Sequence, residues 1–174
     1  MEIIYYVVAS LDGFIATPDG GVDWLSPFEG TGEDYGYAEF YASVDVLLMG
    51  SRTYEQALTF GKWPYEGKPS LVLSKRRLRP GRADVTVSAD PPARVASHLQ
   101  SLDYRRCWLV GGAALAGSMR AAGLISQYVV SLVPVVLGDG IPLFGQQGPR
   151  ERLTLTSSRA FANGLVQVTY TTRS

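Results

Sequence analysis

Two glycine-containing segments each follow an apolar stretch that is expected to be a strand. They are Met49-Gly50-Ser51-Arg52-Thr53 and Val110-Gly111-Gly112-Ala113-Ala114-Leu115. Glycine lets the backbone come close to a phosphate, and the amides at the start of a following helix can bind its oxygens. Each segment alone is equally compatible with an ordinary strand-to-helix turn. Because two such segments occur in one short chain, we predict a dinucleotide site, to which Arg52 and the Thr53 hydroxyl add phosphate-binding groups.

A third segment places a hydroxyl group beside several cations directly after an expected strand. Its sequence is Leu73-Ser74-Lys75-Arg76-Arg77. Such a cluster is able to bind the additional ribose phosphate that distinguishes NADPH from NADH. The alternative interpretation is a solvated basic loop.

The first forty residues supply the carboxyl groups that could protonate a reduced substrate. Transfer of a hydride to a C=N or C=O bond leaves a charge that a nearby acid or a bound water must neutralise. The candidate acids are Asp12, Asp23, Glu29, Glu33 and Asp34. An acid at the start of a helix is also favoured by the helix dipole alone. For Asp12 the preferred interpretation is that it shapes a turn with Gly13.

Aromatic residues in the same part of the chain could bind a flat ring. Trp24, Tyr37 and Phe40 are candidates for stacking on a heterocyclic substrate, although the spacing of Tyr37 and Phe40 is also what core packing requires. The single histidine, His98, is expected on a helix surface, and the single cysteine, Cys107, in the core. No set of residues has the spacing of a metal site.

Composition excludes several classes of function. The 174 residues include 16 Lys and Arg and 16 Asp and Glu, so no basic field is present for a nucleic-acid backbone or an acidic membrane. No apolar stretch approaches the ~20 residues that span a bilayer, and no signal peptide is recognisable. With one cysteine, a disulfide framework is excluded. We therefore expect a cytoplasmic protein that forms a single domain over residues 1–174.

Hydrophobic patterns and turn residues predict alternating strands and helices that would position these groups. Strands are expected at 3–9, 44–49, 70–73, 107–110 and 127–133, and helices at 33–43, 51–58, 93–102 and 113–122. Residues 10–32 read as a long loop rich in Gly, Pro and Asp. Residues 153–161 and 165–170 read as an antiparallel hairpin at the sheet edge. The predicted class is α/β, because strands and helices alternate until the final hairpin.

These motifs occur in the order found in dihydrofolate reductases. The resemblance rests on Ser10-Leu11-Asp12-Gly13-Phe14-Ile15-Ala16, the loop Trp24, Gly50-Ser51-Arg52-Thr53-Tyr54-Glu55, Leu73-Ser74 and Val110-Gly111-Gly112. The later run Pro134-Val135-Val136-Leu137-Gly138-Asp139-Gly140-Ile141-Pro142-Leu143-Phe144 resembles the C-terminal reductase domain of bifunctional riboflavin-biosynthesis proteins.

The resemblance implies a three-layer dihydrofolate reductase-like fold, in which a central mixed, mainly parallel sheet is flanked by helices. It also implies that NADPH lies across the Gly50 and Gly111 segments. It implies a nicotinamide position near Ala9, Ile15 and the loop that carries Trp24. Asp34 precedes Gly50 by sixteen residues, a separation similar to that of the substrate-binding acid in dihydrofolate reductases. Asp34 is therefore the first candidate for the acid, with Glu29 and Asp12 as alternatives. The riboflavin-type branch further implies a homodimer.

Two functions are compatible with this reading. The first is an NADPH-dependent reductase that acts on a pterin, a ribose-linked aminopyrimidine or a related small heterocycle. The second is a catalytically silent nucleotide-binding protein of the same fold that acts as a sensor or an oligomeric scaffold. The two differ in whether NADPH is oxidised, because both retain the phosphate-binding segments.

Overall fold

The computed structural model describes residues 1–145 and 148–172. Their helices and strands follow in the order β1 Glu2–Ser10, β2 Phe14–Ala16, 3-10 helix η1 Asp23–Phe28, α1 Tyr37–Ser43, β3 Val46–Gly50, α2 Ser51–Leu58, β4 Ser70–Leu73, β5 Val85–Ser88, α3 Pro92–Ser101, β6 Arg106–Gly111, α4 Ala113–Ala121, β7 Gln127–Val133, β8 Ile141–Pro142, β9 Leu153–Ala160 and β10 Val166–Thr172. In the described part of the chain, no helix has the length and apolar character needed to cross a membrane.

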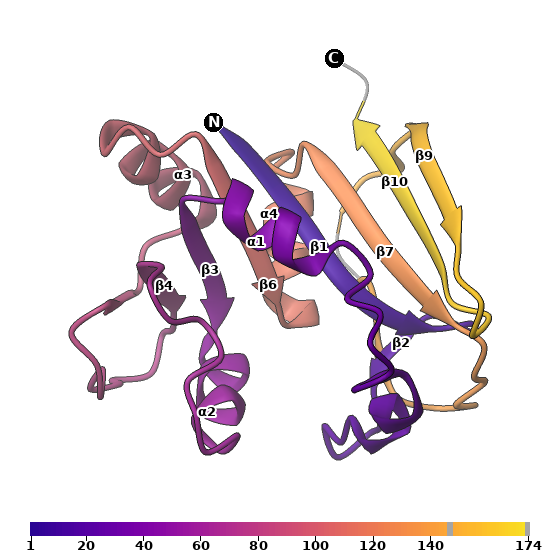
Figure 1. The fold of residues 1–174 in the computed structure, drawn as a ribbon. Helices are drawn as coiled ribbons and strands as arrows, with labels where there is room; N and C mark the ends of the chain where they lie inside the picture. Colours follow the sequence, from indigo (N-terminus) through magenta and orange to yellow (C-terminus); the bar gives the residue numbers. More distant parts are fainter. Residues whose placement is uncertain (146–147, 173–174) are drawn as a thin grey trace.

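Within the described residues, one eight-stranded sheet has the order β5-β4-β3-β6-β1-β7-β10-β9 (Figure 1). The strands from β5 to β7 are parallel, and β10 and β9 join β7 in antiparallel register. The apolar β1 lies between β6 and β7 at the middle of the sheet, as expected for a strand buried on both faces. The mixed, mainly parallel α/β sheet with a C-terminal hairpin at its edge is thus confirmed.

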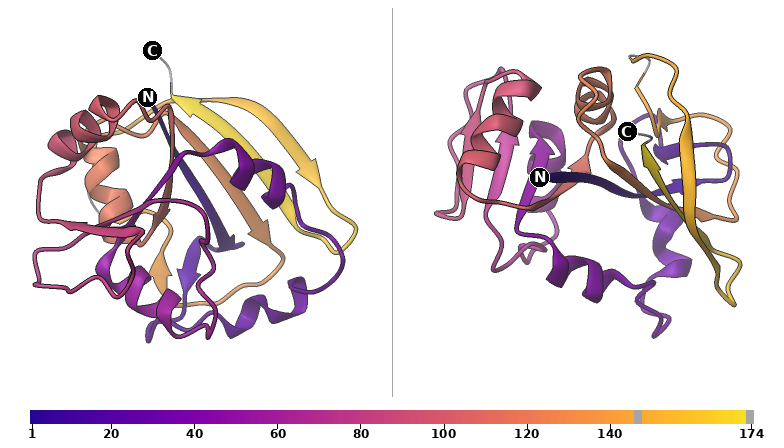
Figure 2. Two further views of the ribbon diagram at one scale, coloured as in Figure 1. Left: turned by 60° about the vertical axis from the view of Figure 1, so that its left-hand side comes forward. Right: turned by 90° about the horizontal axis from the view of Figure 1, so that it is seen from above.

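Helices cover both faces of this sheet, as the view from above shows (Figure 2). Val95 and Leu99 of α3 and Met119 of α4 join a core cluster with Tyr5 and Leu109. On the opposite face α1 and α2 cover a second cluster, built from Leu47, Met49, Tyr54, Trp63, Trp108 and their neighbours. Burial of these apolar side chains on each face fixes the strands, and so fixes the loops that follow them.

The start of one predicted helix was wrong, and three short strands and a 3-10 helix were not predicted. The helix expected from residue 33 begins at Tyr37, because Tyr35 and Gly36 both have positive φ and form a turn in front of it. The segment read as a loop at 10–32 contains β2 and η1. The strand β8 was not predicted, since two residues give too short a pattern, and β5 was not predicted either. The strands at 70–73 and 127–133 and the helix at 51–58 have the predicted bounds.

Candidate functional site

The carboxyl ends of the parallel strands lie side by side along one edge of the sheet. In the order of the strands, Ala89 follows β5, Ser74 follows β4, Gly50 ends β3, Gly111 ends β6 and Ser10 ends β1. Ligands of open α/β sheets bind beyond this edge. The segments that begin at Leu73, Gly50 and Val110, and Ala9 near the end of β1, are therefore brought to one edge of the sheet.

The two glycine segments are in direct proximity at the centre of this edge. A Cβ atom placed on Gly50 would lie 3.7 Å from the Gly111 carbonyl oxygen and 3.7 Å from the Gly112 nitrogen. A Cβ atom on Gly112 would lie 3.4 Å from Thr53 Oγ1. Since these segments are so close, a single pyrophosphate is able to contact both.

Each glycine segment leads into a helix whose first turn has no side-chain cap. Neither Gly50 before α2 nor Gly112 before α4 supplies a side-chain hydrogen bond to the helix start. The amides at such helix starts need an acceptor, and together with the helix dipole they favour an anion. Arg52 is exposed on the first turn of α2. The arrangement fits a pyrophosphate held by backbone amides.

The other predicted residues of these segments differ in accessibility. Ala9 is fully buried and Ala113 is 8% exposed, so each can meet a ligand through its backbone only. Ala114 is exposed on α4. Ile15, Leu73 and Leu115 are half-buried and pack against the core cluster that contains Tyr5 and Leu109. Val110 is half-buried and packs against the cluster on the other face, under α1 and α2.

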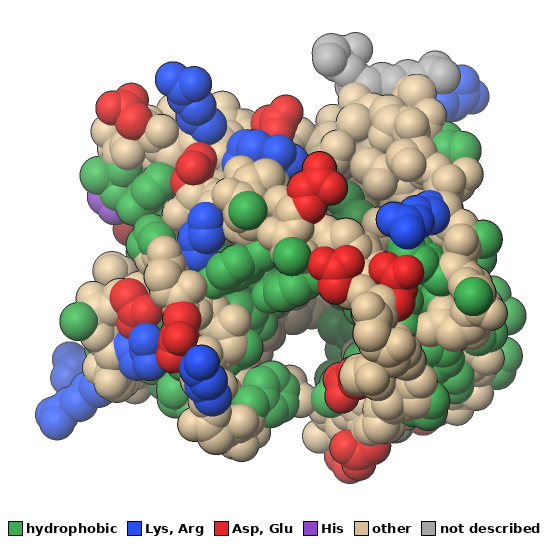
Figure 3. All heavy atoms as spheres, viewed as in Figure 1, with side chains coloured by type: hydrophobic (Ala, Val, Ile, Leu, Met, Phe, Trp, Pro, Cys, Tyr) green, Lys and Arg blue, Asp and Glu red, His purple; other side chains and the backbone are tan. Residues whose placement is uncertain are grey.

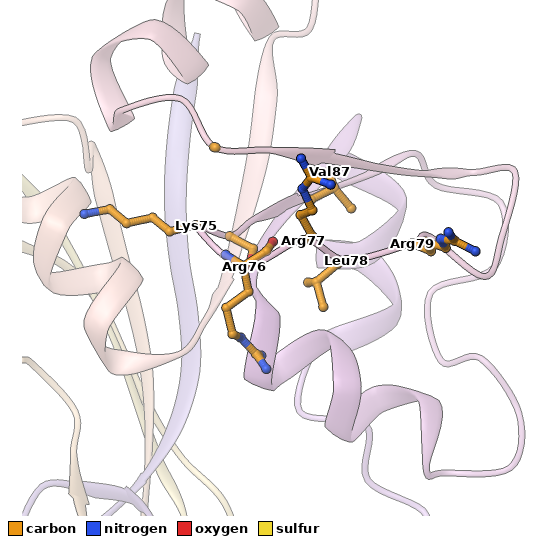
Figure 4. A pocket seen from close by; sticks show the side chains of 8 residues that line it. Lys75, Arg76, Arg77, Leu78, Arg79 and Val87 are labelled. Atoms are coloured by element: carbon orange, nitrogen blue, oxygen red, sulfur yellow. The ribbon is translucent and has the colours of Figure 1, made fainter.

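A basic groove of about 430 Å³ lies beyond β4 and β5. It is lined by Ser74, Lys75, Arg76, Arg77, Leu78, Arg79, Val87 and Ala89. Figure 4 shows Arg76 extending towards α2 and Arg77 extending the other way, past Val87. Cations at the rim and apolar side chains within suit a phosphorylated ribose with an attached base.

Arg76 links this groove to the first glycine segment. Its Nη2 donates to Ser51 Oγ at 3.0 Å and lies 2.8 Å from a carboxylate oxygen of Glu55. The Ser74 hydroxyl accepts a hydrogen bond from the Arg76 amide at 3.0 Å and so orders the turn after β4. These contacts join the basic groove and the α2 helix start into one surface.

Further along the same edge the molecule is deeply hollowed (Figure 3). One side of the hollow is formed by α2 and the connection that follows it, and the other side by the segment that carries η1. The helix α1 lies above it (Figures 1 and 3). We refer to this feature as the hollow. It opens beside α2, the helix that directly follows the first glycine segment.

Aromatic side chains fix α1 over the sheet beside the hollow. The rings of Tyr6 and Phe40 are stacked with centroids 4.1 Å apart, and Tyr37 meets the edge of Trp108 at 5.8 Å. Tyr37 is 36% exposed, so part of its ring remains free for a ligand. Trp24 lies in η1 and packs against the cluster of Val133, Phe161 and Leu165. Its indole nitrogen is buried and has no hydrogen-bond partner within residues 1–145 and 148–172.

Two of the candidate acids accept hydrogen bonds from backbone amides. Asp34 accepts hydrogen bonds from the amides of Gly36 and Ala38 at 3.0 and 3.1 Å, which lowers the pKa of its carboxyl group. Asp12 accepts from the Ser10 hydroxyl at 2.7 Å and from the amides of Leu137 and Gly138, and its pKa is lowered as well.

These contacts hold Asp34 and Asp12 in the ionised form. Asp34 shapes the start of α1, and Asp12 ties the loop after β1 to residues 137–138. Glu29 is exposed directly after η1. Which of the three supplies a proton stays a prediction.

Comparison with known proteins identifies the family. Residues 1–167 match the RibD C-terminal domain. The chain belongs to this family. Two Bacillus subtilis relatives described as uncharacterized, YwjB and YyaP, are 33% and 30% identical to it over 97% of this chain, and the matches cover 97% and 94% of their own lengths.

Solved structures agree with this assignment. A Shewanella protein assigned to riboflavin biosynthesis is 27% identical, with a TM-score of 0.92 and full coverage of both chains. A Thermotoga maritima protein described as a diaminohydroxyphosphoribosylaminopyrimidine deaminase and 5-amino-6-(5-phosphoribosylamino)uracil reductase has a TM-score of 0.76 at 12% identity. That match covers 99% of this chain and 56% of the larger protein. The dihydrofolate reductase-like fold and the riboflavin-type branch are therefore both confirmed.

Several residues of this surface were not predicted. Arg79, Leu78 and Val87 line the basic groove, and Tyr6 supplies the ring on which Phe40 stacks. The alternation of Val85-Thr86-Val87-Ser88 is a short strand pattern and would have indicated β5. The place of Tyr6 depends on which face of β1 meets α1, which strand composition does not reveal.

Proposed function

We propose that this protein is an NADPH-dependent reductase that passes a hydride to a pterin, a ribose-linked aminopyrimidine or a related small heterocycle. The observation that carries the proposal is the order of groups along one sheet edge. The basic groove, the two adjoining glycine segments and the hollow follow one another across neighbouring strands. This order matches the parts of a dinucleotide followed by its substrate.

The chain's own residues would hold the cofactor in the following way. The basic groove would take the adenosine end, with Arg76 and Arg77 on the additional phosphate. The uncapped starts of α2 and α4 would bind the pyrophosphate. When bound, the nicotinamide supplies the hydride, and the protein supplies position and electrostatics.

The substrate would lie in the hollow, beside the aromatic wall of α1. Tyr37 has exposed ring surface, and Phe40 is held rigidly by Tyr6. Flat heterocycles stack on such rings. Apolar walls also exclude water, which strengthens hydrogen bonds to the polar edge of the substrate.

The test is steady-state oxidation of NADPH with a panel of dihydropterins and aminopyrimidines. Oxidation that depends on one of these compounds supports the proposal. Binding of NADPH without turnover of any member would favour the silent nucleotide-binding protein instead. Absence of NADPH binding, measured by thermal shift, would contradict both functions; saturation at one hundred times the dissociation constant should add about 2.7 kcal/mol to the unfolding free energy.

We further propose that the protein acts in the cytoplasm as a homodimer. The apolar β7 is not the exposed strand, because it pairs with both β1 and β10. The outer strand is β9, which is exposed over most of its length and presents Leu155 at 52% exposure. An uncovered edge of this kind invites pairing with another strand. Light scattering that gives a monomeric mass over a wide concentration range would contradict the dimer.

A further inference from the structure

The net charge of zero conceals a strong separation of charge along the chain. Residues 1–51 contain nine Asp or Glu and no Lys, Arg or His. Residues 52–174 contain all sixteen basic residues and the other seven acidic ones. The two groups of opposite charge are therefore carried by different parts of the fold.

The structure places this separation across the proposed site. The segment from β1 to α1 forms the η1 side of the hollow and the helix above it (Figures 1 and 3). We call its acids the acidic rim; they are Asp12, Asp19, Asp23, Glu29, Glu33, Asp34 and Glu39. In Figure 3 acidic side chains stand along this side, whereas over α2 and the connection after it basic side chains stand together with acidic ones, several of which they pair with.

The acids of the rim have few basic partners, and Arg159 acts on both Glu33 and Asp34. Hydrogen bonds lower the pKa of Asp12, Asp19 and Asp34, so these groups stay charged at neutral pH. Among the described residues, the single ion pair formed by the rim joins Glu33 to Arg159 at 4.0 Å, with both side chains well exposed. The cations of the basic groove lie across the glycine segments from it, beyond β4 and β5.

This division has a consequence for ligands. The cations of the basic groove attract a phosphate group. The carboxylates of the acidic rim repel it, because like charges in a partly enclosed site raise the energy of a bound anion. A neutral or cationic ring meets no such penalty, and the aromatic wall of Tyr37 and Phe40 favours it.

We propose that the substrate of this protein is a flat heterocycle without a phosphate group, either neutral or cationic. The inference rests on the proposed reductase function and narrows it. Among the candidate substrates, ribose-linked aminopyrimidines without a phosphate group remain possible. Their phosphate esters are no longer candidates.

The test compares two matched pairs of compounds with the intact protein. The pairs are 5-amino-6-(ribosylamino)uracil with its 5′-phosphate and dihydroneopterin with its phosphate. We expect the unphosphorylated member of at least one pair to bind the NADP⁺-loaded protein in calorimetry, about tenfold more tightly than its phosphate ester. The difference should shrink as ionic strength rises, because the rim is exposed and salt screens it. A preference caused by shape alone would not respond to salt.

A charge-reversal variant identifies the source of the preference. Asp23 is exposed in the first turn of η1. Asp23→Lys should reduce the ratio of the two affinities, unphosphorylated compound over phosphate ester, about threefold. Glu2→Lys is the matched control, because Glu2 is an exposed acid at the opposite end of β1. The control should leave the discrimination unchanged.

The outcomes separate this inference from the proposed function. Equal or tighter binding of the phosphate esters, or failure of all four compounds to bind, would overturn the inference. Faster NADPH oxidation with a phosphate ester than with its partner would overturn the inference and uphold the reductase. If NADPH itself does not bind, the proposed function is wrong, whichever of the four compounds bind.

Discussion

The side chain of Gln56 on α2 donates a hydrogen bond from Nε2 to the carbonyl oxygen of Gly20, 3.1 Å away. Gly20 lies in a tight turn closed by hydrogen bonds from the Gly20 amide to the Thr17 oxygen and from the Thr17 amide to the Gly21 oxygen. The contact joins residues that are 36 positions apart. It therefore connects the loop that precedes η1 to the helix on the other side of the hollow.

This contact should slow the departure of a bound cofactor. Removing the donor with Gln56→Ala should raise the dissociation rate of NADPH about 2- to 10-fold, the effect of losing a hydrogen bond of about 0.5–1.5 kcal/mol. Stopped-flow fluorescence measures the rate. Gln100→Ala on the exposed surface of α3 is the matched control and should leave it unchanged. An unaltered rate in Gln56→Ala would show that the loop does not restrain the cofactor.

A side chain at Gly112 should prevent NADPH binding without unfolding the protein. Its φ of −78° is accessible to any residue, but a Cβ atom there already lies 3.4 Å from Thr53 Oγ1. The branches of valine would extend into the space that a pyrophosphate needs. We expect no NADPH-dependent thermal shift in Gly112→Val and a weakened shift in Gly112→Ala. Wild-type affinity in a folded Gly112→Val protein would remove this segment from the site.

Arg77 should contribute to the choice between NADPH and NADH. It lines the basic groove and, among the described residues, forms no ion pair, whereas Arg76 is paired with Glu55. Loss of one charge-assisted hydrogen bond, about 1.5–3 kcal/mol, should reduce NADPH affinity in Arg77→Ala by about 10- to 100-fold and leave NADH affinity unchanged. Arg94→Ala at the exposed start of α3 serves as control. An equal loss of affinity for NADPH and NADH would mean that Arg77 does not bind the additional phosphate.

Much of the fold could be predicted because most of its strands are short apolar runs bounded by turn and loop residues such as Gly, Pro and Ser. The bounds of β4, β7 and α2 follow directly from such patterns. The glycine segments and the basic run were also recognisable, since they lie in continuous stretches of sequence. Sequence order alone could not show that Gly50 and Gly112 are close, because β3 and β6 become neighbours only in the sheet.

Features that depend on contacts between distant segments were not predictable. Asp34 could be read as an acid or as a helix-start residue, and only the positions of the Gly36 and Ala38 amides distinguish the two. Tyr6 and Gln56 carry no local signal, because their partners Phe40 and Gly20 are far along the chain. Such residues become visible when the tertiary structure is known.

Gln167 should stabilise the turn before α1. Its side-chain amide donates to Ser131 Oγ at 3.0 Å and to the Tyr35 carbonyl oxygen at 3.3 Å, and Ser131 is only 2% exposed. Gln167→Leu would leave these acceptors without a donor and should lower the unfolding free energy by about 1–3 kcal/mol, seen as a lower melting temperature. Thr169→Val, on the same strand, should have a smaller effect. Equal melting temperatures for Gln167→Leu and wild type would contradict this role.

Asp34 allows the catalytic and structural interpretations to be separated. If Asp34 supplies the proton, Asp34→Asn should lower kcat/KM by about 100- to 10,000-fold. The geometry favours the other outcome, because both carboxylate oxygens accept backbone amides and the pKa is lowered. We therefore expect Asp34→Asn to keep NADPH affinity and to retain kcat/KM within a few-fold, since the amide oxygen still accepts one of the two hydrogen bonds.

The pH dependence of stability gives an independent measurement on the same residue. A carboxyl group whose pKa is lowered by folding stabilises the protein above the pKa of the unfolded chain, about 3.9, and loses this effect as the pH falls through the folded-state value. Wild type should therefore melt above Asp34→Asn at neutral pH, and the difference should disappear in acid. If the two proteins instead melt alike at neutral pH while turnover collapses in the variant, the helix-start interpretation is wrong and Asp34 acts on the substrate.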